Sequence, residues 1–327
     1  MKKKIALIYG GDSSEYEVSL KSGKHIEQHI DKDRYEVYEV LIRGSEWNVL
    51  YGQSKNEETS AMLPIDKADF SFVTPGGVRV YFDKALVMIH GTPGENGLLQ
   101  AYFEMIGMAS TTSPATVSLL TFNKYACKCF LRDTGVKMPR EQFLRADDDF
   151  SVYDISIKLG LPLFVKPNNG GSSFGASKVT RLEQLNEAIE KAFSQDSAIL
   201  IEEYIEGLEL TNGVYEHNGS TVRLPVTEIV PDNEFFDYAA KYQGASQEIT
   251  PARISSELSE RVIDLSHKIY RFLGCKGFVR VDYIVKNNEI YFLEINTVPG
   301  MTEMSLVPQQ IRAAGLTITQ FLTQLLG

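Results

Sequence analysis

Near the carboxyl end, two short segments alternate apolar and polar residues with a period of two, and this pattern leaves few alternatives to a β-hairpin. The segments are residues 278–283 and 290–300, and each predicts one strand. The polar residues 286–288 between them have the composition of a tight turn. We therefore expect the two strands to pair with each other in antiparallel orientation.

Polar side chains of the predicted hairpin should meet at one end. Glu294 and Asn296 are two residues apart and share one face of their strand, and Asp282 can join them from the paired strand. Such oxygen ligands suit Mg²⁺, which takes one or two carboxylates and completes its shell with water and phosphates. Arg280 is two residues from Asp282 and would point at the same spot. A cation site beside an arginine is typical of phosphoryl transfer.

Length and charge limit the classes of protein to consider. With 327 residues, the chain exceeds one ordinary domain, which favours two or three packed units. Its net charge of −10 argues against a nucleic-acid partner, because phosphates require a basic face. A protein of this charge that binds a nucleotide must concentrate its cations locally.

The sequence predicts a cytoplasmic protein. The apolar residues 5–9 are too few for a signal peptide, and no stretch approaches the roughly 20 apolar residues of a membrane span. Cys127, Cys129 and Cys275 are an odd number without a disulfide framework, which fits a reducing compartment. We interpret them as small core or helix residues, because Cys127 and Cys129 lack the companions of a zinc site.

The first part of the chain alternates strands with helices. Strands are predicted at residues 5–9, 35–42 and 85–89, and helices at 19–30 and 98–106. This order predicts an α/β fold with a parallel sheet and with functional loops at the carboxyl ends of the strands. The pattern changes near residue 113 and again near 206. We therefore predict units at residues 1–112, 113–205 and 206–327.

A Gly- and Ser-rich loop at residues 168–175 lies between two predicted strands. Its glycines let the backbone approach a phosphate, and its N–H groups can hold one together with the hydroxyls of Ser172 and Ser173. Lys166, just before the loop, sits in an apolar context where an unpaired ammonium would be costly, and Lys124 offers a second cation. The alternatives are a solvated hairpin loop and a surface lysine.

The segment that joins the second and third units can bind an adenosine. Residues 202–205 follow an apolar strand and can present N–H and C=O groups to the edge of an adenine. Glu209 can then accept hydrogen bonds from ribose hydroxyls. The alternative is a linker whose acidic residues are solvated.

Other features have both a functional and a structural interpretation. Residues 235–249 can form a lid that excludes water, or a surface loop anchored by aromatic residues. Glu15 can hold a substrate ammonium, or it can favour the dipole of a helix that Ser13 or Ser14 caps. His90 ends a buried strand, either as a satisfied core or loop histidine or as a group near the substrates.

Together, in this order, these motifs resemble the D-alanine–D-alanine ligases of the ATP-grasp superfamily over nearly the full length of the chain. Each motif has limited specificity, but their joint presence is highly specific. The motifs are Gly10-Gly11, Glu15, Val18-Ser19-Leu20, His90-Gly91, Gly94-Glu95-Asn96-Gly97, Lys166-Pro167, Gly171-Ser172-Ser173, Ala240-Lys241-Tyr242, Gly277-Phe278-Val279-Arg280-Val281-Asp282, Glu294-Ile295-Asn296-Thr297-Val298-Pro299-Gly300-Met301-Thr302 and Ser305-Leu306.

The resemblance implies an ATP-grasp fold, in which an amino-terminal doubly wound parallel-sheet domain precedes two α+β subdomains that clasp ATP. It also implies ATP-dependent condensation of two D-alanines for peptidoglycan synthesis. The carboxylate of the first D-alanine would attack the γ-phosphate, giving an acyl phosphate and ADP. The amine of the second would then attack the acyl phosphate through a tetrahedral oxyanion, and phosphate would leave.

The resemblance further implies roles for individual residues. The ligands of two Mg²⁺ ions, for which Mn²⁺ can substitute, would be Asp282, Glu294 and Asn296. ATP would contact Lys124, Lys166, Ser172, Ser173, Glu202, Glu203, Tyr204, Ile205, Glu209 and Lys241. Catalytic roles would fall to Glu15, Ser172, Tyr242, Arg280, Gly300 and Ser305. The substrates would also contact His90, Lys241 and Leu306.

Within this set, Glu15 would bind the first ammonium, and Ser172 and Tyr242 would link to it. Arg280 and the Gly300 N–H would form the oxyanion hole. Relatives that make D-alanyl-D-lactate often have a residue without a hydroxyl at the position of Tyr242, so this tyrosine favours an amine acceptor.

The expected partners are ATP, D-alanine and a second copy of the chain, because this family is usually dimeric through its amino-terminal unit; no nucleic acid or membrane is expected. One alternative is a sibling ATP-grasp carboxylate–amine ligase or a D-alanine–D-lactate ligase. Another is a non-catalytic ATP-binding regulator. A dehydrogenase is disfavoured, because Gly10-Gly11 is not followed by the Gly-x-Gly-x-x-Gly spacing.

Overall fold

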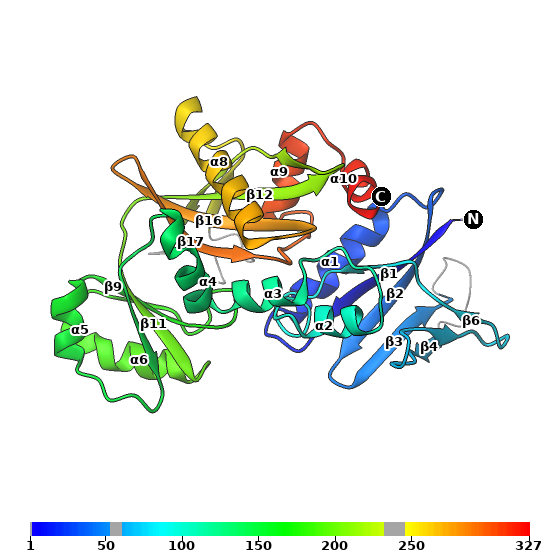
Figure 1. The fold of residues 1–327 in the computed structure, drawn as a ribbon, viewed down its shortest axis with the longest axis horizontal. Coiled ribbons are helices and arrows are strands. Elements are labelled where there is room, and N and C mark those ends of the chain that lie inside the picture. The colour runs from blue at the N-terminus through cyan, green and yellow to red at the C-terminus, as the bar shows by residue number, and fades with distance from the viewer. Residues whose placement is uncertain (1, 53–60, 232–245) are drawn as a thin grey trace.

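A computed structural model describes residues 2–52, 61–231 and 246–327. Three larger sheets follow one another along the molecule, with the amino-terminal sheet at one end (Figure 1). Each of the three predicted units contains one of these sheets. The unit boundaries at residues 112 and 205 remain predictions.

The amino-terminal sheet has the order β4-β3-β2-β1-β7. Its central strand β1 pairs in parallel with β2 and β7, as expected, whereas β3 and β4 extend the sheet in antiparallel orientation. A separate two-stranded ribbon pairs β5 with β6. The bounds are β1 Lys3–Gly10, β2 Tyr35–Arg43, β3 Glu46–Tyr51, β4 Ala61–Pro64, β5 Phe72–Val73, β6 Arg79–Val80 and β7 Lys84–Val87.

Helices cover both faces of this sheet, as the predicted doubly wound arrangement requires. Alternate residues of a strand point to opposite faces, so Ile5 and Leu7 pack against one group of helices and Ala6 and Ile8 against another. The first group is α1 Tyr16–His29 and α10 Ile318–Leu326, and the second contains α2 Leu98–Met105. The carboxy-terminal helix therefore packs on the amino-terminal sheet (Figure 1).

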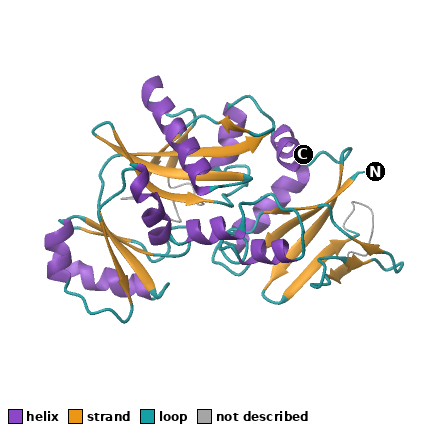
Figure 2. Ribbon diagram, in the orientation of Figure 1, coloured by secondary structure: helices purple, strands orange, loops and turns teal. Residues whose placement is uncertain are grey.

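The central sheet is antiparallel in the order β10-β9-β11-β8 and has helices on one face (Figure 2). Leu163 and Val165 of β9 pack against these helices, so Phe164 and Lys166 point to the other face. The elements are β8 Glu141–Arg145, α5 Val152–Leu159, β9 Leu163–Pro167, β10 Ser177–Val179, α6 Leu185–Phe193 and β11 Ala198–Glu203.

The carboxy-terminal sheet has the order β15-β14-β12-β16-β17, with β13 beside β12. One face packs on α8, α3 and α4. Cys127 of α4 and Cys275, just after α8, are buried in this core. The elements are α3 Ala115–Phe122, α4 Lys124–Leu131, β12 Leu208–His217, β13 Ser220–Arg223, β14 Thr227–Pro231, β15 Ser246–Ile249, α8 Ser256–Leu273, β16 Phe278–Lys286, β17 Glu289–Asn296 and α9 Leu306–Ala313.

The predicted hairpin is confirmed as β16 and β17, joined by Asn287 and Asn288. Both asparagines have positive φ, at 50° and 65°, a conformation that suits a two-residue hairpin turn and that asparagine tolerates. A bulge interrupts the pairing next to Asp282, because Asp282 opposes Glu294 while Tyr283 opposes Phe292. Leu293 is the extra residue, and the bulge alters the direction of the neighbouring Glu294.

Within the described ranges, no helix combines the length and the apolar character that a membrane crossing requires.

Candidate active site

The helix-free face of the central sheet and one face of the β16–β17 hairpin enclose a cavity of about 420 Å³. This volume is in the range of small-molecule sites, roughly 300–1,000 Å³. The cavity brings together the predicted nucleotide and metal residues that lie in the described ranges, except Asn296. They are Lys124, Lys166, Ser172, Ser173, Glu202, Glu203, Tyr204, Ile205, Glu209, Asp282 and Glu294.

A second, smaller cavity adjoins the first and shares Ser172 with it. It collects residues from segments that follow strands of the amino-terminal sheet, from the end of β17 and from the start of α9. The predicted substrate and catalytic residues among its lining are Glu15, His90, Ser172, Arg280, Gly300, Ser305 and Leu306, and Asn296 also lines it.

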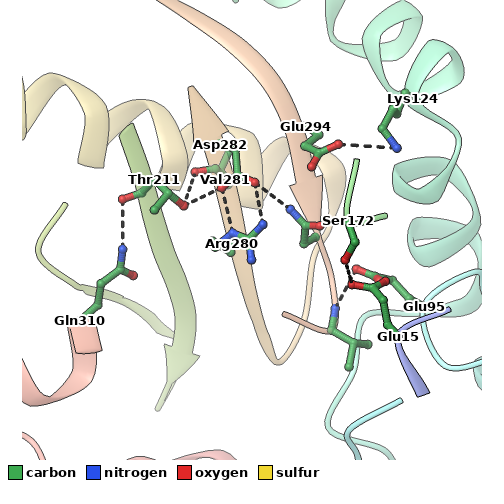
Figure 3. Close-up of polar contacts among 12 residues, drawn as sticks. Glu15, Glu95, Lys124, Ser172, Thr211, Arg280, Val281, Asp282, Glu294 and Gln310 are labelled. Atoms are coloured by element: carbon green, nitrogen blue, oxygen red, sulfur yellow. Dashed lines mark hydrogen bonds and ion pairs between the residues drawn. The ribbon is translucent and has the colours of Figure 1, made fainter. Parts of the chain in front are cut away.

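The hairpin contributes to both cavities because its register aligns four polar residues on one face. Asp282 lies opposite Glu294, and Arg280 lies opposite Asn296. Arg280 donates from Nε and Nη2 to the two oxygens of Asp282, at 2.8 and 2.7 Å. Figure 3 shows this pair between Thr211 and Ser172. The guanidinium and the carboxylate thus point at the same spot, as the sequence predicts.

The donor set of the hairpin fits a hard divalent cation. Two carboxylates and an amide supply only oxygen and nitrogen, and Asp282 and Glu294 line the cavity beside Lys124 and Lys166. Within the described ranges there is no cluster of three or more His, Cys, Asp or Glu side chains that could hold a metal alone. The two carboxylates of the hairpin match Mg²⁺, which uses one or two carboxylates and leaves its other positions to water and phosphate.

Asp282 is a strongly hydrogen-bonded member of this set. Besides Arg280, it accepts from the Thr211 hydroxyl at 2.6 Å and from the Asn296 amide at 3.1 Å. Thr211 was not predicted from the sequence, because it lies on β12 and becomes a neighbour of Asp282 only through strand pairing.

Lys166 is paired with Glu202 inside the larger cavity. The distance between Lys166 Nζ and Glu202 Oε2 is 2.9 Å, and Lys128 binds the other oxygen of Glu202 and lies 3.2 Å from Glu141. Burial alone would raise the pKa of Glu202, but the two ammonium groups lower it. Burial lowers the pKa of Lys166. The nucleotide side therefore contains a network of alternating buried charges.

Lys128 is the member of this network that sequence reasoning missed. It is 1% exposed, although it lies on an amphipathic helix in a sequence that gives no sign of burial. Burial acts to lower its pKa, but Glu202 and Glu141 more than offset this and leave the pKa raised. The spacing of Lys124 and Lys128 on one helix was the available signal, since residues four apart share a face.

Lys124 begins α4, where Asn123 caps the helix by accepting from the Ala126 N–H. Its ammonium donates to the Gly170 carbonyl at 2.5 Å and lies 3.5 Å from Glu294 (Figure 3). It therefore connects the Gly/Ser loop to the hairpin and is not the surface lysine of the alternative interpretation.

The Gly/Ser loop closes on Glu15 from the amino-terminal part. Ser172 donates its hydroxyl hydrogen to Glu15 Oε1, and Ser172 is only 4% exposed. A Cβ on Gly171 would lie 2.7 Å from Glu15 Oε2, so this position has no room for a side chain. Ser172 and Ser173 both have positive φ, 54° and 57°, which is costly for residues other than glycine. The loop is thus a packed element and not a solvated hairpin loop.

The turn before α1 also differs from its structural alternative. Glu15 is the N-cap residue of α1 and the helix has no side-chain cap, while the Ser13 hydroxyl donates to the His90 carbonyl. His90 is buried and both ring nitrogens are hydrogen-bonded to the protein, as expected of a satisfied core or loop histidine. It also borders the smaller cavity, and a place near the substrates stays a prediction. Burial lowers its pKa.

Like Thr211 and Lys128, Glu95 is a residue that the sequence did not place in the site. It borders the smaller cavity and accepts from the N–H groups of Gly91 and Val298, at 3.2 and 3.3 Å. Burial, with the nearby charge of Glu15, raises its pKa from 4.5 to about 7. The signal available was the motif that contains it, Gly94-Glu95-Asn96-Gly97.

Ser305 and Leu306 stand where α9 begins. Ser305 is the N-cap residue, and its hydroxyl accepts from the Thr302 N–H at 3.0 Å. The first N–H groups of a helix point outward and favour an anion. The start of α9 at the wall of the smaller cavity is therefore suited to a carboxylate or phosphate group.

The connector, residues 202–205 between the second and third units, makes polar and cation–π contacts through its own side chains. Glu203 accepts from the backbone and the Nε of Arg140, each at 2.8 Å. The Lys178 ammonium lies 4.4 Å from the centre of the Tyr204 ring. Tyr204, Ile205 and Glu209 border the larger cavity, so the connector is a wall of the site as well as a linker.

The family follows from the match of two family models. The model described as D-ala D-ala ligase N-terminus matches residues 4–113, and that described as D-ala D-ala ligase C-terminus matches residues 130–327. The chain belongs to the D-alanine–D-alanine ligase family. It is 48% identical to the D-alanine–D-alanine ligase of Parabacteroides distasonis, over 100% of this chain and 97% of that protein.

Solved structures of this ligase family share the fold. The VanG D-Ala:D-Ser ligase of Enterococcus faecalis has a TM-score of 0.89 and 32% identity, and the match covers 100% of this chain and 99% of that chain. The D-alanine–D-alanine ligase of Bacillus anthracis complexed with ATP has a TM-score of 0.77 and 29% identity, over 99% and 95% of the two chains. The predicted ATP-grasp fold is thereby confirmed.

Two predicted residues of the ligase site, Lys241 and Tyr242, lie outside the described residues. The predicted lid at 235–249 is described only from residue 246, where it forms β15. The roles of these residues remain predictions from the resemblance.

Proposed function

We propose that this chain is an ATP-dependent ligase that joins two D-alanine molecules into D-alanyl-D-alanine through an acyl phosphate. The observation that carries the proposal is that one face of the β16–β17 hairpin borders both cavities, Asp282 and Glu294 the larger and Arg280 and Asn296 the smaller. A nucleotide in the larger cavity would present its γ-phosphate to a carboxylate in the smaller one. Such proximity is a main source of rate enhancement in transfer reactions.

On the nucleotide side, Lys124 and Lys166 would neutralise phosphate oxygens, with the N–H groups of the Gly/Ser loop. Residues 202–205 and Glu209 would surround adenosine. Asp282, Glu294 and Asn296 would hold Mg²⁺, or Mn²⁺ in its place. When bound, these ions supply neutralising charge to the phosphates and polarise the γ-phosphoryl group.

On the substrate side, Glu15 would bind the ammonium of the first D-alanine, supported by the hydrogen bond from Ser172. An oxygen of the carboxylate of the first D-alanine attacks the γ-phosphorus of ATP. The bond between this phosphorus and the oxygen of the β-phosphate breaks, and ADP is released. The uncharged amine of the second D-alanine then attacks the acyl carbon. The carbonyl electron pair moves onto oxygen, where Arg280 and the Gly300 N–H stabilise it. When the pair returns, the bond between the acyl carbon and the phosphate oxygen breaks, and the phosphate leaves with the proton that the nitrogen releases.

The second D-alanine would bind at the start of α9. Ser305 and the Leu306 N–H would hold its carboxylate, and Lys241 would contact the transferred phosphoryl group. His90 borders the same cavity, but its hydrogen bonds go to the protein. The peptide product supplies peptidoglycan synthesis, which places the enzyme in the cytoplasm, and a homodimer is the proposed assembly.

A phosphate-release assay with ATP, Mg²⁺ and D-alanine tests the proposal. We expect stoichiometric ADP and D-alanyl-D-alanine, the latter identified by mass spectrometry. Saturable ATP binding without phosphate release would favour a regulator instead. Turnover with another acid and amine, but none with D-alanine, would indicate a sibling ligase.

The structural similarity to the VanG D-Ala:D-Ser ligase favours one further candidate, D-serine as the second substrate. Equimolar D-alanine, D-serine and D-lactate in one assay distinguish the acceptors. We expect the D-alanyl-D-alanine product to dominate. A Tyr242→Phe variant should shift the product ratio towards D-alanyl-D-lactate, and an unchanged ratio across pH would refute the selectivity assigned to Tyr242.

A further inference from the structure

We propose that Ser22, His25, His90 and Glu95 are positioning residues that hold the backbone of residues 298–301, so that the Gly300 N–H is aimed into the smaller cavity. We call this group the loop clamp. The inference rests on the proposed function, in which the Gly300 N–H stabilises the oxyanion. It adds a role for four side chains that the reaction itself does not use.

The clamp binds the peptide groups on the amino side of Gly300. The Val298 N–H donates to Glu95 Oε1 at 3.3 Å, and the Val298 carbonyl accepts from His90 Nδ1 at 2.7 Å. Val298 is 1% exposed. Both backbone groups of this residue are therefore held by side chains that lie more than two hundred positions earlier in the sequence.

The clamp binds Met301 in the same way on the carboxyl side. The Met301 N–H donates to the Ser22 hydroxyl at 3.2 Å, and its carbonyl accepts from His25 Nδ1 at 2.7 Å. Ser22 and Met301 are both fully buried. Ser22 and His25 lie on α1, and Glu15 is the N-cap residue of this helix. One helix therefore supports both the proposed ammonium site and the loop that carries Gly300.

The two halves of the clamp are joined by a hydrogen bond of 3.0 Å between Ser22 Oγ and His90 Nε2. A carbonyl oxygen can only accept, so Val298 requires the proton of His90 on Nδ1. Nε2 of the neutral ring then accepts from the Ser22 hydroxyl, whose oxygen accepts from Met301. The hydrogen bonds therefore form one chain with a defined direction, which fixes the ring of His90 and the hydroxyl of Ser22 together.

The two residues between the clamped ends have little freedom of their own. Pro299 has a fixed φ and no N–H. A Cβ on Gly300 would lie 2.9 Å from the Ser305 hydroxyl, so the chain passes close to the start of α9. With Val298 and Met301 fixed, the direction of the Gly300 N–H is set by the fold before substrate binds. Preorganised donors of this kind account for much of oxyanion stabilisation.

Two serines of α1 provide a matched test. Ser22→Ala removes one hydroxyl, which is both the acceptor for Met301 and the donor to His90, and Ser22 lines neither of the two cavities. Ser19→Ala is the control, because Ser19 is equally buried on the same helix and makes two hydrogen bonds of its own, with Gly10 N–H and Met88 carbonyl. The two hydrogen bonds of Ser19 join α1 to β1 and to Met88, just after β7, and not to residues 298–301.

We expect Ser22→Ala to lower kcat roughly 10- to 100-fold, since displacing a catalytic group by about 1 Å can cost about 100-fold. KM for ATP should stay within about twofold, because the variant leaves ground-state binding intact. Affinity for a phosphinate analogue of the dipeptide, which carries a tetrahedral oxyanion, should fall by the same factor as kcat. Ser19→Ala should lose similar stability but retain kcat and analogue affinity.

Hydrogen exchange of the peptide that contains residues 298–301 gives a readout independent of activity. It should be faster in Ser22→Ala and in His25→Leu than in Ser19→Ala. Equal exchange and equal kcat in the Ser22 and Ser19 variants would overturn the clamp. Failure of the wild-type protein to form D-alanyl-D-alanine would instead overturn the proposed function, while the exchange measurement would still decide whether the clamp exists.

Discussion

Ser172 donates a hydrogen bond to Glu15, which lies 157 positions earlier in the chain, and this contact closes the Gly/Ser loop onto the amino-terminal part (Figure 3). Both residues are buried, and Gly171 leaves no space between the loop and the second oxygen of Glu15. The proposed binding group for the first D-alanine is thus oriented by the same loop that borders the nucleotide cavity.

Replacing Ser172 by alanine should weaken the use of D-alanine more than the use of ATP. A buried hydrogen bond to a charged group is worth about 1.5–3 kcal/mol, so we expect kcat/KM for D-alanine to fall roughly 10- to 100-fold. Steady-state kinetics with each substrate varied in turn provide the measurement. Ser177→Ala on β10 is the control, since its hydroxyl accepts from Lys191 at 3.3 Å and Ser177 lines neither of the two cavities. Equal kinetics in the two variants would contradict the role of Ser172.

Replacing Glu294 by glutamine should abolish most phosphate release while the fold persists, because one of two carboxylates in the proposed metal site loses its charge. We expect a loss of at least about 100-fold in kcat at ordinary Mg²⁺, within the range of removing one electrostatic stabiliser. Glu289→Gln at the other end of β17 is the control, because this exposed residue pairs with Lys137 outside the cavities. Circular dichroism checks the fold, and wild-type turnover in Glu294→Gln would refute the metal assignment.

Replacing Lys128 by methionine should destabilise the protein and weaken ATP binding. The change removes the Lys128 ammonium from both Glu202 and Glu141 and leaves Glu202 with Lys166 alone, and breaking a buried ion pair from one side costs about 3–5 kcal/mol. Without Lys128, the Glu202 carboxylate would change its position and shift the Lys166 ammonium, which is proposed to neutralise phosphate oxygens. The affinity for ATP should therefore fall. Urea unfolding and nucleotide titration measure the two effects. Lys158→Met, an exposed position, should change stability by less than about 0.5 kcal/mol.

Glu95 should make the stability of the ligand-free protein depend on pH. Its pKa is raised from 4.5 to about 7 on folding, so between these values the folded state keeps a proton that the unfolded state releases. This contribution is fully present below pH 4.5 and is lost as the pH rises towards 7. Its size is on the order of 2–3 kcal/mol.

The Glu95→Gln variant isolates this contribution. We expect the free energy of unfolding of the wild type, relative to that of the variant, to fall between pH 5 and 7.5. Urea denaturation at several pH values provides the comparison, and other titrating groups such as Glu248 cancel in the difference. Parallel stability curves for the two proteins would show that Glu95 does not titrate in this window.

Local patterns predicted the strands and helices that lie near the site. The period-two alternation identified β16 and β17, and the asparagines between them identified the turn, because these signals depend on residues close in sequence. The alternation of strands and helices identified the parallel core of the amino-terminal sheet. It did not reveal the antiparallel β3 and β4, whose pairing depends on contacts with β2 and not on local pattern.

One physical cause explains why the sequence did not predict three residues of the site. Lys128, Glu95 and Thr211 have ordinary local sequences, and their importance comes from burial against groups that are distant in the chain. Burial in a low-dielectric environment is what gives such groups strong pairing and displaced pKa values. A spacing or a motif can mark such a residue as a candidate, as for Lys128 and Glu95, but it does not show which distant groups surround the side chain.

By itself, the sequence determined which segments form the hairpin, the Gly/Ser loop and the connector, and it predicted candidate side chains for phosphate and metal chemistry. Only the tertiary structure decided that Ser172 meets Glu15, that Lys128 and Lys166 share Glu202, and that α1 binds the loop around Gly300 at Met301. The reason is that short-range periodicity encodes the direction of a side chain, whereas its partner is selected by the packing of separate sheets.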